Sequence, residues 1–133
     1  MTIAVDFDGT IVEHKYPEIG KEKPFAIETL LQLQEDGNRL ILWTSREGEL
    51  LEKAIDFCHA RGLDFYAVNS NQPAGALFAG QAGTKIIADV YIDDRNIGGL
   101  PDWGTIYEII CKKREHKHKK HKKKSLFGKL FRG

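Results

Sequence analysis

The sequence predicts an α/β fold in which a mainly parallel, doubly wound sheet is flanked by helices. Short apolar runs of strand length alternate with amphipathic runs of helical period, the pattern expected of a parallel sheet. Glycine, proline and asparagine separate these runs, and polar residues follow three of the apolar ones. A chain of 133 residues that is 41% hydrophobic suits one compact domain.

The first half of the chain predicts two strands with a helix between them. Residues 2–5 are apolar and partly β-branched, and they form the first strand. Residues 13–24 are polar and contain two prolines and a glycine, which predicts a loop. From Pro24, apolar residues recur at helical spacing, from Phe25 to Leu33, and Gly37 ends the helix. Residues 40–43 form the second strand.

The second half continues the alternation. It predicts an amphipathic helix over residues 50–61, a third strand over 65–68, a fourth strand over 86–92 and a last helix that begins over 103–111. Residues 69–83 contain a proline and several glycines, so they are expected to form an irregular connection or a weak helix. No apolar run approaches the roughly 18 residues of a membrane span, and no secretory signal precedes the first strand. A cytoplasmic location is therefore expected.

Charge divides the chain into an acidic body and a basic tail. Residues 112–133 contain eleven Lys and Arg against one acid, Glu115, whereas residues 1–111 contain nine basic and eighteen acidic residues. We therefore expect a folded domain over 1–111 and a tail over 112–133 that is disordered or a frayed helical extension. Such a tail could bind nucleic acid or an anionic membrane, or fold back on the acidic body and promote self-association.

Acidic and hydroxyl side chains follow three of the predicted strands, at the ends where a ligand would bind. Asp6 and Asp8 follow the first strand, Thr44 follows the second, and Asp93 and Asp94 follow the fourth. The carboxyl ends of parallel strands form the ligand-binding edge of such a sheet. Two carboxylates about 6 Å apart repel by about 3 kcal/mol at an effective dielectric near 20, so the cluster needs a proton or a cation. Hard oxygen ligands favour Mg²⁺.

The motif Asp6-Phe7-Asp8-Gly9-Thr10 after an apolar strand resembles motif one of the haloacid dehalogenase superfamily of phosphohydrolases. Thr44 resembles motif two, Lys85 motif three, and Asp93-Asp94 motif four, in the order of that family. The resemblance covers most of residues 1–111. It implies a phosphatase, and a small phosphorylated metabolite as its substrate.

The resemblance also implies a role for each matched residue. Asp6 would attack phosphorus and form an aspartyl phosphate, while Asp8 would protonate the leaving oxygen and later deprotonate water. Mg²⁺ would lie between Asp6, the backbone carbonyl of Asp8 and Asp93; Asp94 would be a further ligand or would orient the other ligands. Thr44 and Lys85 would hold the phosphoryl oxygens. A solvated Lys85 at the start of a strand remains an alternative.

Four further residues are candidates for substrate binding. Gly9 and Thr10 complete the turn beside the phosphate, and Ser45 competes with Thr44 because alternation along a strand sends neighbours to opposite sides. Arg46 could bind a second anionic group, although a surface salt bridge is its simpler interpretation. His14 follows the first motif closely and could reach substrate.

Neither interval between motifs has room for an inserted cap domain. The 33 residues between Thr10 and Thr44 already supply a loop, a helix and a strand. An uncapped site leaves substrate choice to loops or to a partner subunit. Two other functions stay open: a catalytically weak binding protein whose tail recruits nucleic acid or membrane, and a phosphoacceptor receiver domain. The receiver is disfavoured because its accepting aspartate lies on a middle strand, and the third strand here ends in Val68-Asn69.

Overall fold

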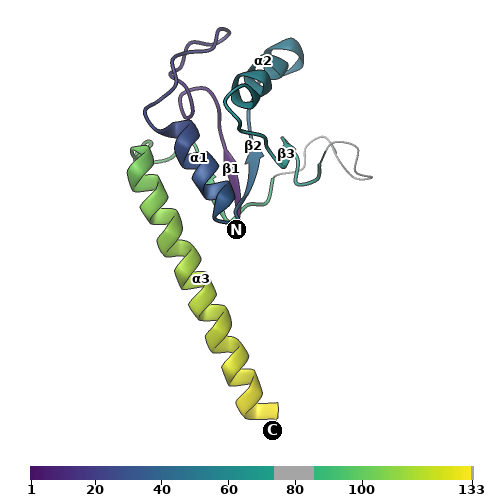
Figure 1. Ribbon diagram of the computed structural model, residues 1–133, viewed down its shortest axis with the longest axis vertical. Helices are drawn as coiled ribbons and strands as arrows, with labels where there is room; N and C mark the ends of the chain where they lie inside the picture. The colour runs from purple at the N-terminus through teal and green to yellow at the C-terminus, as the bar shows by residue number, and fades with distance from the viewer. Residues whose placement is uncertain (74–85, 133) are drawn as a thin grey trace.

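The computed structural model describes residues 1–73 and 86–132, with side chains up to Lys124. Its centre is an all-parallel sheet of four strands in the order β3-β2-β1-β4 (Figure 1). The strands are β1 (Thr2–Val5), β2 (Arg39–Leu42), β3 (Ala67–Val68) and β4 (Val90–Ile92). The helices are α1 (Ala26–Glu35), α2 (Gly48–His59) and α3 (Trp103–Arg132). The prediction of an α/β fold with a parallel sheet is confirmed.

Two predicted elements are corrected. The fourth strand begins at Val90 rather than Ile86, because the backbone groups of residues 86–88 bond to side chains instead of to β1. Ile87 bonds through both its N–H and its carbonyl to the amide of Asn71, and the Tyr91 hydroxyl donates to the Ile86 carbonyl. Phe25 is not part of the apolar face of α1: it precedes the helix with φ of 65° and is 68% exposed.

The described helices bury their apolar residues against one face of the sheet. Alternate strand residues, Ile3 and Val5 in β1 and Leu40 and Leu42 in β2, share a core with α1, α2 and α3. The opposite face carries Ala4, Ile41 and Ala67, packed with Ile86 and with Trp43, Ala88 and Tyr91. A doubly wound fold needs a helix there, and the connection that would supply it includes residues 74–85. The expected weak helix or irregular connection, and Lys85, therefore lie largely or wholly outside the described residues.

The last helix, α3, extends well beyond residues 103–111, where the apolar pattern predicted it to begin. Trp103, Ile106 and Ile110 bury its first turns in the core, and the indole N–H of Trp103 donates to the Thr10 carbonyl at 3.2 Å. The helix then continues through the basic tail to Arg132 and runs beyond the body (Figure 1). The tail is thus a helical extension. None of the helices in the described parts is long and apolar enough to cross a membrane.

Candidate functional site

Strand register brings three polar loops to one edge of the sheet. Val5 pairs with Leu42 of β2 and with Ile92 of β4, so these three strands end level with one another. The residues that follow are Asp6, Trp43 and Asp93. The chain leaves β1 toward β2 on one side, while β4 lies on the other, and a crevice opens at such a reversal of strand order. The site is therefore a consequence of topology as well as of motif.

The three aspartate side chains that were predicted as metal ligands lie together. Carboxylate oxygens of Asp6, Asp93 and Asp94 are all within 4.8 Å of one another. Burial, and next the charge of Asp93, raise the pKa of Asp6 to about 7. Asp94 Oδ1 is buried and accepts no hydrogen bond from any described group. A divalent cation would relieve both the repulsion and the unsatisfied oxygen, so this donor set fits Mg²⁺.

Thr10 forms hydrogen bonds to two members of this cluster and is not placed to bind substrate. It is fully buried; its hydroxyl donates to Asp6 Oδ2 at 3.2 Å and accepts from the backbone N–H of Asp94 at 3.1 Å. One hydroxyl therefore joins the loop after β1 to the loop after β4. The predicted substrate contact of Thr10 is corrected, because its hydrogen-bonding capacity is used within the fold.

Gly9 is required by space as well as by conformation. Its φ is +82°, and a Cβ there would collide with the carboxylate of Asp94. Gly9 thus lets the backbone of the motif approach the acidic cluster. The place of Gly9 beside the phosphate stays a prediction.

We expect Gly9→Ala to destabilise the protein more than Gly62→Ala. Gly62 has the same φ of +82°, but a Cβ there would meet nothing within 4 Å. The control therefore carries only the cost of the left-handed conformation, about 1 kcal/mol, whereas Gly9→Ala must also displace Asp94. Urea unfolding of both variants measures the difference, and Mg²⁺ titration should show weaker binding for Gly9→Ala alone. Equal losses of stability would show that Asp94 does not constrain Gly9.

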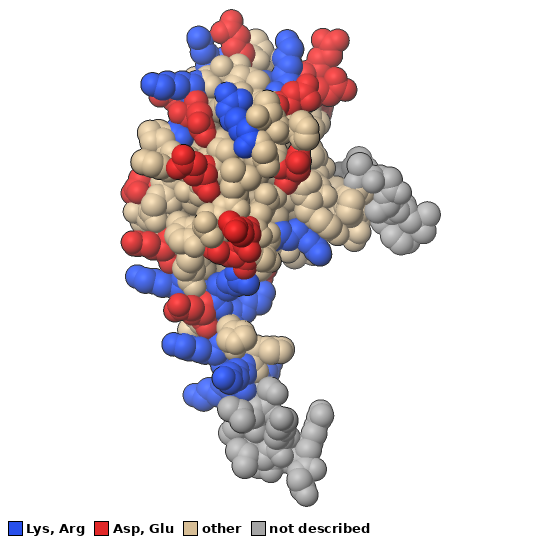
Figure 2. Space-filling model, viewed as in Figure 1, with Lys and Arg blue, Asp and Glu red and all other residues tan. Residues whose placement is uncertain are grey.

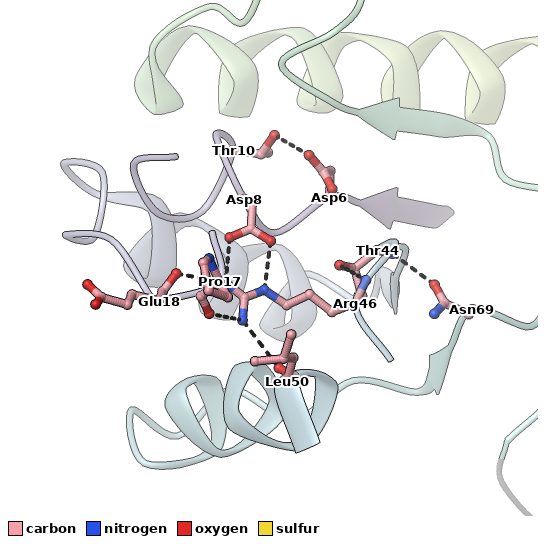
Figure 3. A network of polar contacts seen from close by, with 9 residues as sticks. All are labelled: Asp6, Asp8, Thr10, Pro17, Glu18, Thr44, Arg46, Leu50 and Asn69. Atoms are coloured by element: carbon pink, nitrogen blue, oxygen red, sulfur yellow. Dashed lines mark hydrogen bonds and ion pairs between the residues drawn. The ribbon is translucent and has the colours of Figure 1, made fainter. Parts of the chain in front are cut away.

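Arg46 is an internal residue whose main partner is Asp8 (Figure 3). Its Nε and one terminal nitrogen each donate to a different carboxylate oxygen of Asp8 at 2.7 Å. The remaining donors reach the backbone carbonyls of Pro17, Glu18 and Leu50. The side chain of Arg46 is 0% exposed and that of Asp8 is 12% exposed.

The guanidinium of Arg46 therefore has no donor left for a substrate. All five of its N–H bonds are used, so the prediction of a second anion site is wrong. The predicted salt bridge exists, but it is internal rather than at the surface. The same pairing turns the Asp8 carboxylate away from the metal cluster, which consists of Asp6, Asp93 and Asp94 without the Asp8 side chain. Sequence reasoning missed this pair because its members are 38 positions apart.

Thr44 and Ser45 both line the site, contrary to the expectation that strand alternation would separate them. The reason is that β2 ends at Leu42, so the extended geometry does not continue to these residues. The Thr44 hydroxyl accepts from the backbone N–H of Arg46 at 3.1 Å, and the Thr44 N–H donates to the side chain of Asn69 at 2.8 Å. Thr44 is held on both sides, and its hydroxyl hydrogen can still be donated to a ligand.

The candidate residues surround one cavity of about 530 Å³. Asp6, Asp8, Thr44, Ser45 and Asp93 line it, together with four further residues: His14, Tyr16, Trp43 and Arg95. Only His14 of these four was predicted. Trp43 and Arg95 are adjacent to motif residues, and this proximity was the one signal that could have identified them; Tyr16 lies six residues after the first motif, and no sequence signal identified it.

A comparison with solved structures shows one protein similar over nearly the whole chain. It is a conserved protein from Bacteroides thetaiotaomicron, with 61% sequence identity, a TM-score of 0.78, and coverage of 85% of this chain and 91% of that chain. No family model and no curated protein matches this sequence. Identity at this level over most of both chains indicates common descent. The chain therefore belongs to the same protein family as this conserved Bacteroides thetaiotaomicron protein.

Proposed function

We propose that the protein is a Mg²⁺-dependent phosphomonoester hydrolase with the doubly wound fold and aspartyl-phosphate chemistry of the haloacid dehalogenase superfamily. The observation that carries this proposal is the meeting of Asp6, Asp93 and Asp94 within 4.8 Å at the edge of the sheet. Thr44 lines the same cavity as Asp6 and Asp93. The site thus offers a carboxylate nucleophile, a cation-binding group and a hydroxyl donor.

Asp6 is the proposed nucleophile. A carboxylate oxygen of Asp6 attacks phosphorus, the bond from phosphorus to the ester oxygen breaks, and an aspartyl phosphate forms. Water then attacks that phosphorus and releases inorganic phosphate and free Asp6. Bound Mg²⁺, held by Asp6, Asp93 and Asp94, would supply positive charge that reduces the repulsion between carboxylate and phosphate. Thr10 fixes Asp6 Oδ2 by a hydrogen bond, so the attacking group is oriented before substrate binds.

Thr44 is proposed to donate its hydroxyl hydrogen to a phosphoryl oxygen, supported by Arg46 and Asn69 through backbone hydrogen bonds. Lys85 remains a sequence-based prediction for the second phosphate contact. Asp8 is proposed to protonate the leaving oxygen and to deprotonate water. Both of its oxygens accept from Arg46, so proton transfer by Asp8 requires one of these hydrogen bonds to lengthen.

The aromatic lining of the cavity favours a substrate with a planar leaving group. Trp43 and Tyr16 line the cavity, and Trp43 is braced by Tyr91 in an edge-on contact with ring centroids 5.4 Å apart. Aromatic side chains stack on planar groups, whereas Arg95 and His14 offer hydrogen bonds to further polar atoms. A small phosphorylated metabolite with a ring next to the ester is therefore the proposed substrate class.

Hydrolysis of an aryl phosphate by the full chain tests the proposed function. We expect release of phosphate in Mg²⁺ and none in EDTA. Asp93→Asn should raise the Mg²⁺ concentration needed for half-maximal activity by about tenfold or more, because one carboxylate ligand becomes a neutral amide. Asp56→Asn, at an exposed position on α2, is the matched control and should be unchanged. Activity that is indifferent to EDTA, or an Asp93→Asn enzyme with unaltered Mg²⁺ dependence, would contradict the assignment.

A further inference from the structure

The distal part of α3 carries a dense positive charge that the fold does not use. Residues 112–124 contain nine Lys and Arg, three His and a single acid, Glu115. Every side chain from Lys112 to Lys124 is exposed. Figure 2 shows these basic side chains on the part of the helix that lies beyond the body. Because basic residues occur on all sides of this stretch, it has no apolar face with which to pack on the domain.

Only the first turns of this stretch are attached to the body. Arg114 donates to the carbonyl of Asp36, and Lys117 Nζ lies 2.7 Å from Asp89 Oδ1. Among the described contacts, no hydrogen bond or ion pair joins residues 118–124 to the rest of the protein. Of the nine Lys and Arg at residues 112–124, Lys117 is thus the only one with an ion pair to an acidic side chain in the part of the chain that the structure describes. Like charges along a helix repel one another, so an external anion would stabilise the segment.

We propose that the distal half of α3 attaches the protein to an anionic lipid bilayer. The choice of partner depends on the sequence that follows the lysines. Residues 125–132 read Ser-Leu-Phe-Gly-Lys-Leu-Phe-Arg, in which the pairs Leu126-Phe127 and Leu130-Phe131 recur after four residues. This spacing is that of an interfacial helix with an apolar face. A bilayer accommodates such apolar residues beside basic ones, whereas a nucleic acid backbone neutralises only the lysines.

The length of the basic stretch separates the acidic body from an anionic membrane that would repel it. A body of charge −9 is repelled by any anionic surface. The seven helical residues from His118 to Lys124, which follow the last described ion pair with the body, span about 10 Å at 1.5 Å per residue, whereas the Debye length in physiological salt is about 8 Å. The helix therefore holds the body where repulsion from the membrane is screened. This attachment is peripheral, and it does not depend on the proposed phosphatase activity.

Vesicle sedimentation of the full-length protein tests the proposal. The probes are phosphatidylcholine vesicles with and without about 30% phosphatidylglycerol, in about 0.1 M and about 0.5 M salt. We expect binding to the anionic vesicles at the lower salt only. Removing four charges in K119Q/K120Q/K122Q/K123Q should weaken binding by about a hundredfold or more. F127S/F131S should weaken it by about tenfold or more while leaving all charges in place.

The matched control K15Q/K21Q/K23Q/K53Q removes four lysines from the body and should bind anionic vesicles within about threefold of the natural sequence, because salt screens the charge of the body from the membrane. Failure of the full chain to bind anionic vesicles would overturn the proposal. Salt-sensitive binding to duplex DNA or RNA without vesicle binding would also overturn it and would assign α3 to nucleic acid. Unchanged vesicle binding by F127S/F131S would refute insertion of the apolar residues.

Discussion

Asp6→Asn is expected to abolish phosphate release, with a loss of at least about a thousandfold in kcat. The amide has no anionic oxygen with which to attack phosphorus, so the covalent intermediate cannot form. Side-chain size and the hydrogen bond from Thr10 are nearly preserved, because the remaining carbonyl oxygen of the amide can still accept it. Steady-state kinetics with an aryl phosphate, in parallel with Asp56→Asn, measures the effect. Equal activity of Asp6→Asn and the natural sequence would remove Asp6 from the nucleophilic role.

The same variant should gain stability in the absence of metal ions. The pKa of Asp6 rises from 3.8 to about 7 in the folded protein, mainly through burial and the charge of Asp93. Between these two pH values the folded state binds more protons than the unfolded state, so Asp6 makes stability fall as pH rises from about 4 to about 7. The full shift corresponds to about 4 kcal/mol, and partial exposure reduces the expected effect at pH 8 to about 1–2 kcal/mol.

Urea unfolding in EDTA from pH 4 to pH 8 measures this effect. The natural sequence should lose stability over this range more steeply than Asp6→Asn, and Mg²⁺ should restore stability at pH 8 to the natural sequence more than to the variant. A functional carboxylate is thus expected to cost stability, and its removal to give an inactive but more stable protein. If Asp6→Asn were inactive and also less stable at pH 8, loss of the fold would explain its inactivity.

Arg46→Met is expected to lower the free energy of unfolding by about 3–5 kcal/mol. Methionine fills much of the space of the arginine stem, but it leaves Asp8 with two oxygens that have lost their donors. Three backbone carbonyls, of Pro17, Glu18 and Leu50, also lose one donor each. Urea unfolding followed by circular dichroism measures the loss. Arg61→Met is the control, since Arg61 is an exposed arginine that also donates to a backbone carbonyl, and it should lose less than about 1 kcal/mol.

A double-mutant cycle separates the charge of Asp8 from the other losses. Asp8→Asn in the Arg46→Met background removes the uncompensated carboxylate, so the double variant should be less destabilised than the sum of the two single variants. The carbonyls of the loop at residues 17–18 stay unpaired in both, and the rescue should be partial. Strict additivity would show that Asp8 and Arg46 do not act as a pair in solution.

Most of the fold could be predicted from local sequence pattern, because each strand and helix must place its apolar residues at regular intervals to bury them in the core. The strand at residues 2–5, the strand that was predicted at 40–43 and lies at 39–42, and the helix ending before Gly37 follow from apolar period and from glycine, which are properties of neighbouring residues. The pattern predicted a strand wrongly where the backbone forms hydrogen bonds with side chains instead of with a neighbouring strand. Ile86 and Ile87 look like strand residues, yet their backbone groups bond to Tyr91 and Asn71. The alternation of apolar and polar residues does not reveal whether the backbone bonds to a strand or to a side chain.

For the candidate site, the sequence determined which acids would gather, because Asp6, Asp93 and Asp94 follow strands that must end at one edge of a parallel sheet. Only the tertiary structure decided what their neighbours do. Arg46 is enclosed with Asp8, Thr10 joins two loops, and Gly9 makes room for Asp94. Hydrophobic periodicity is a property of neighbouring residues and can be recognised in the sequence. Hydrogen-bond partners are set by distance in space between residues far apart in the chain, which only the folded chain specifies.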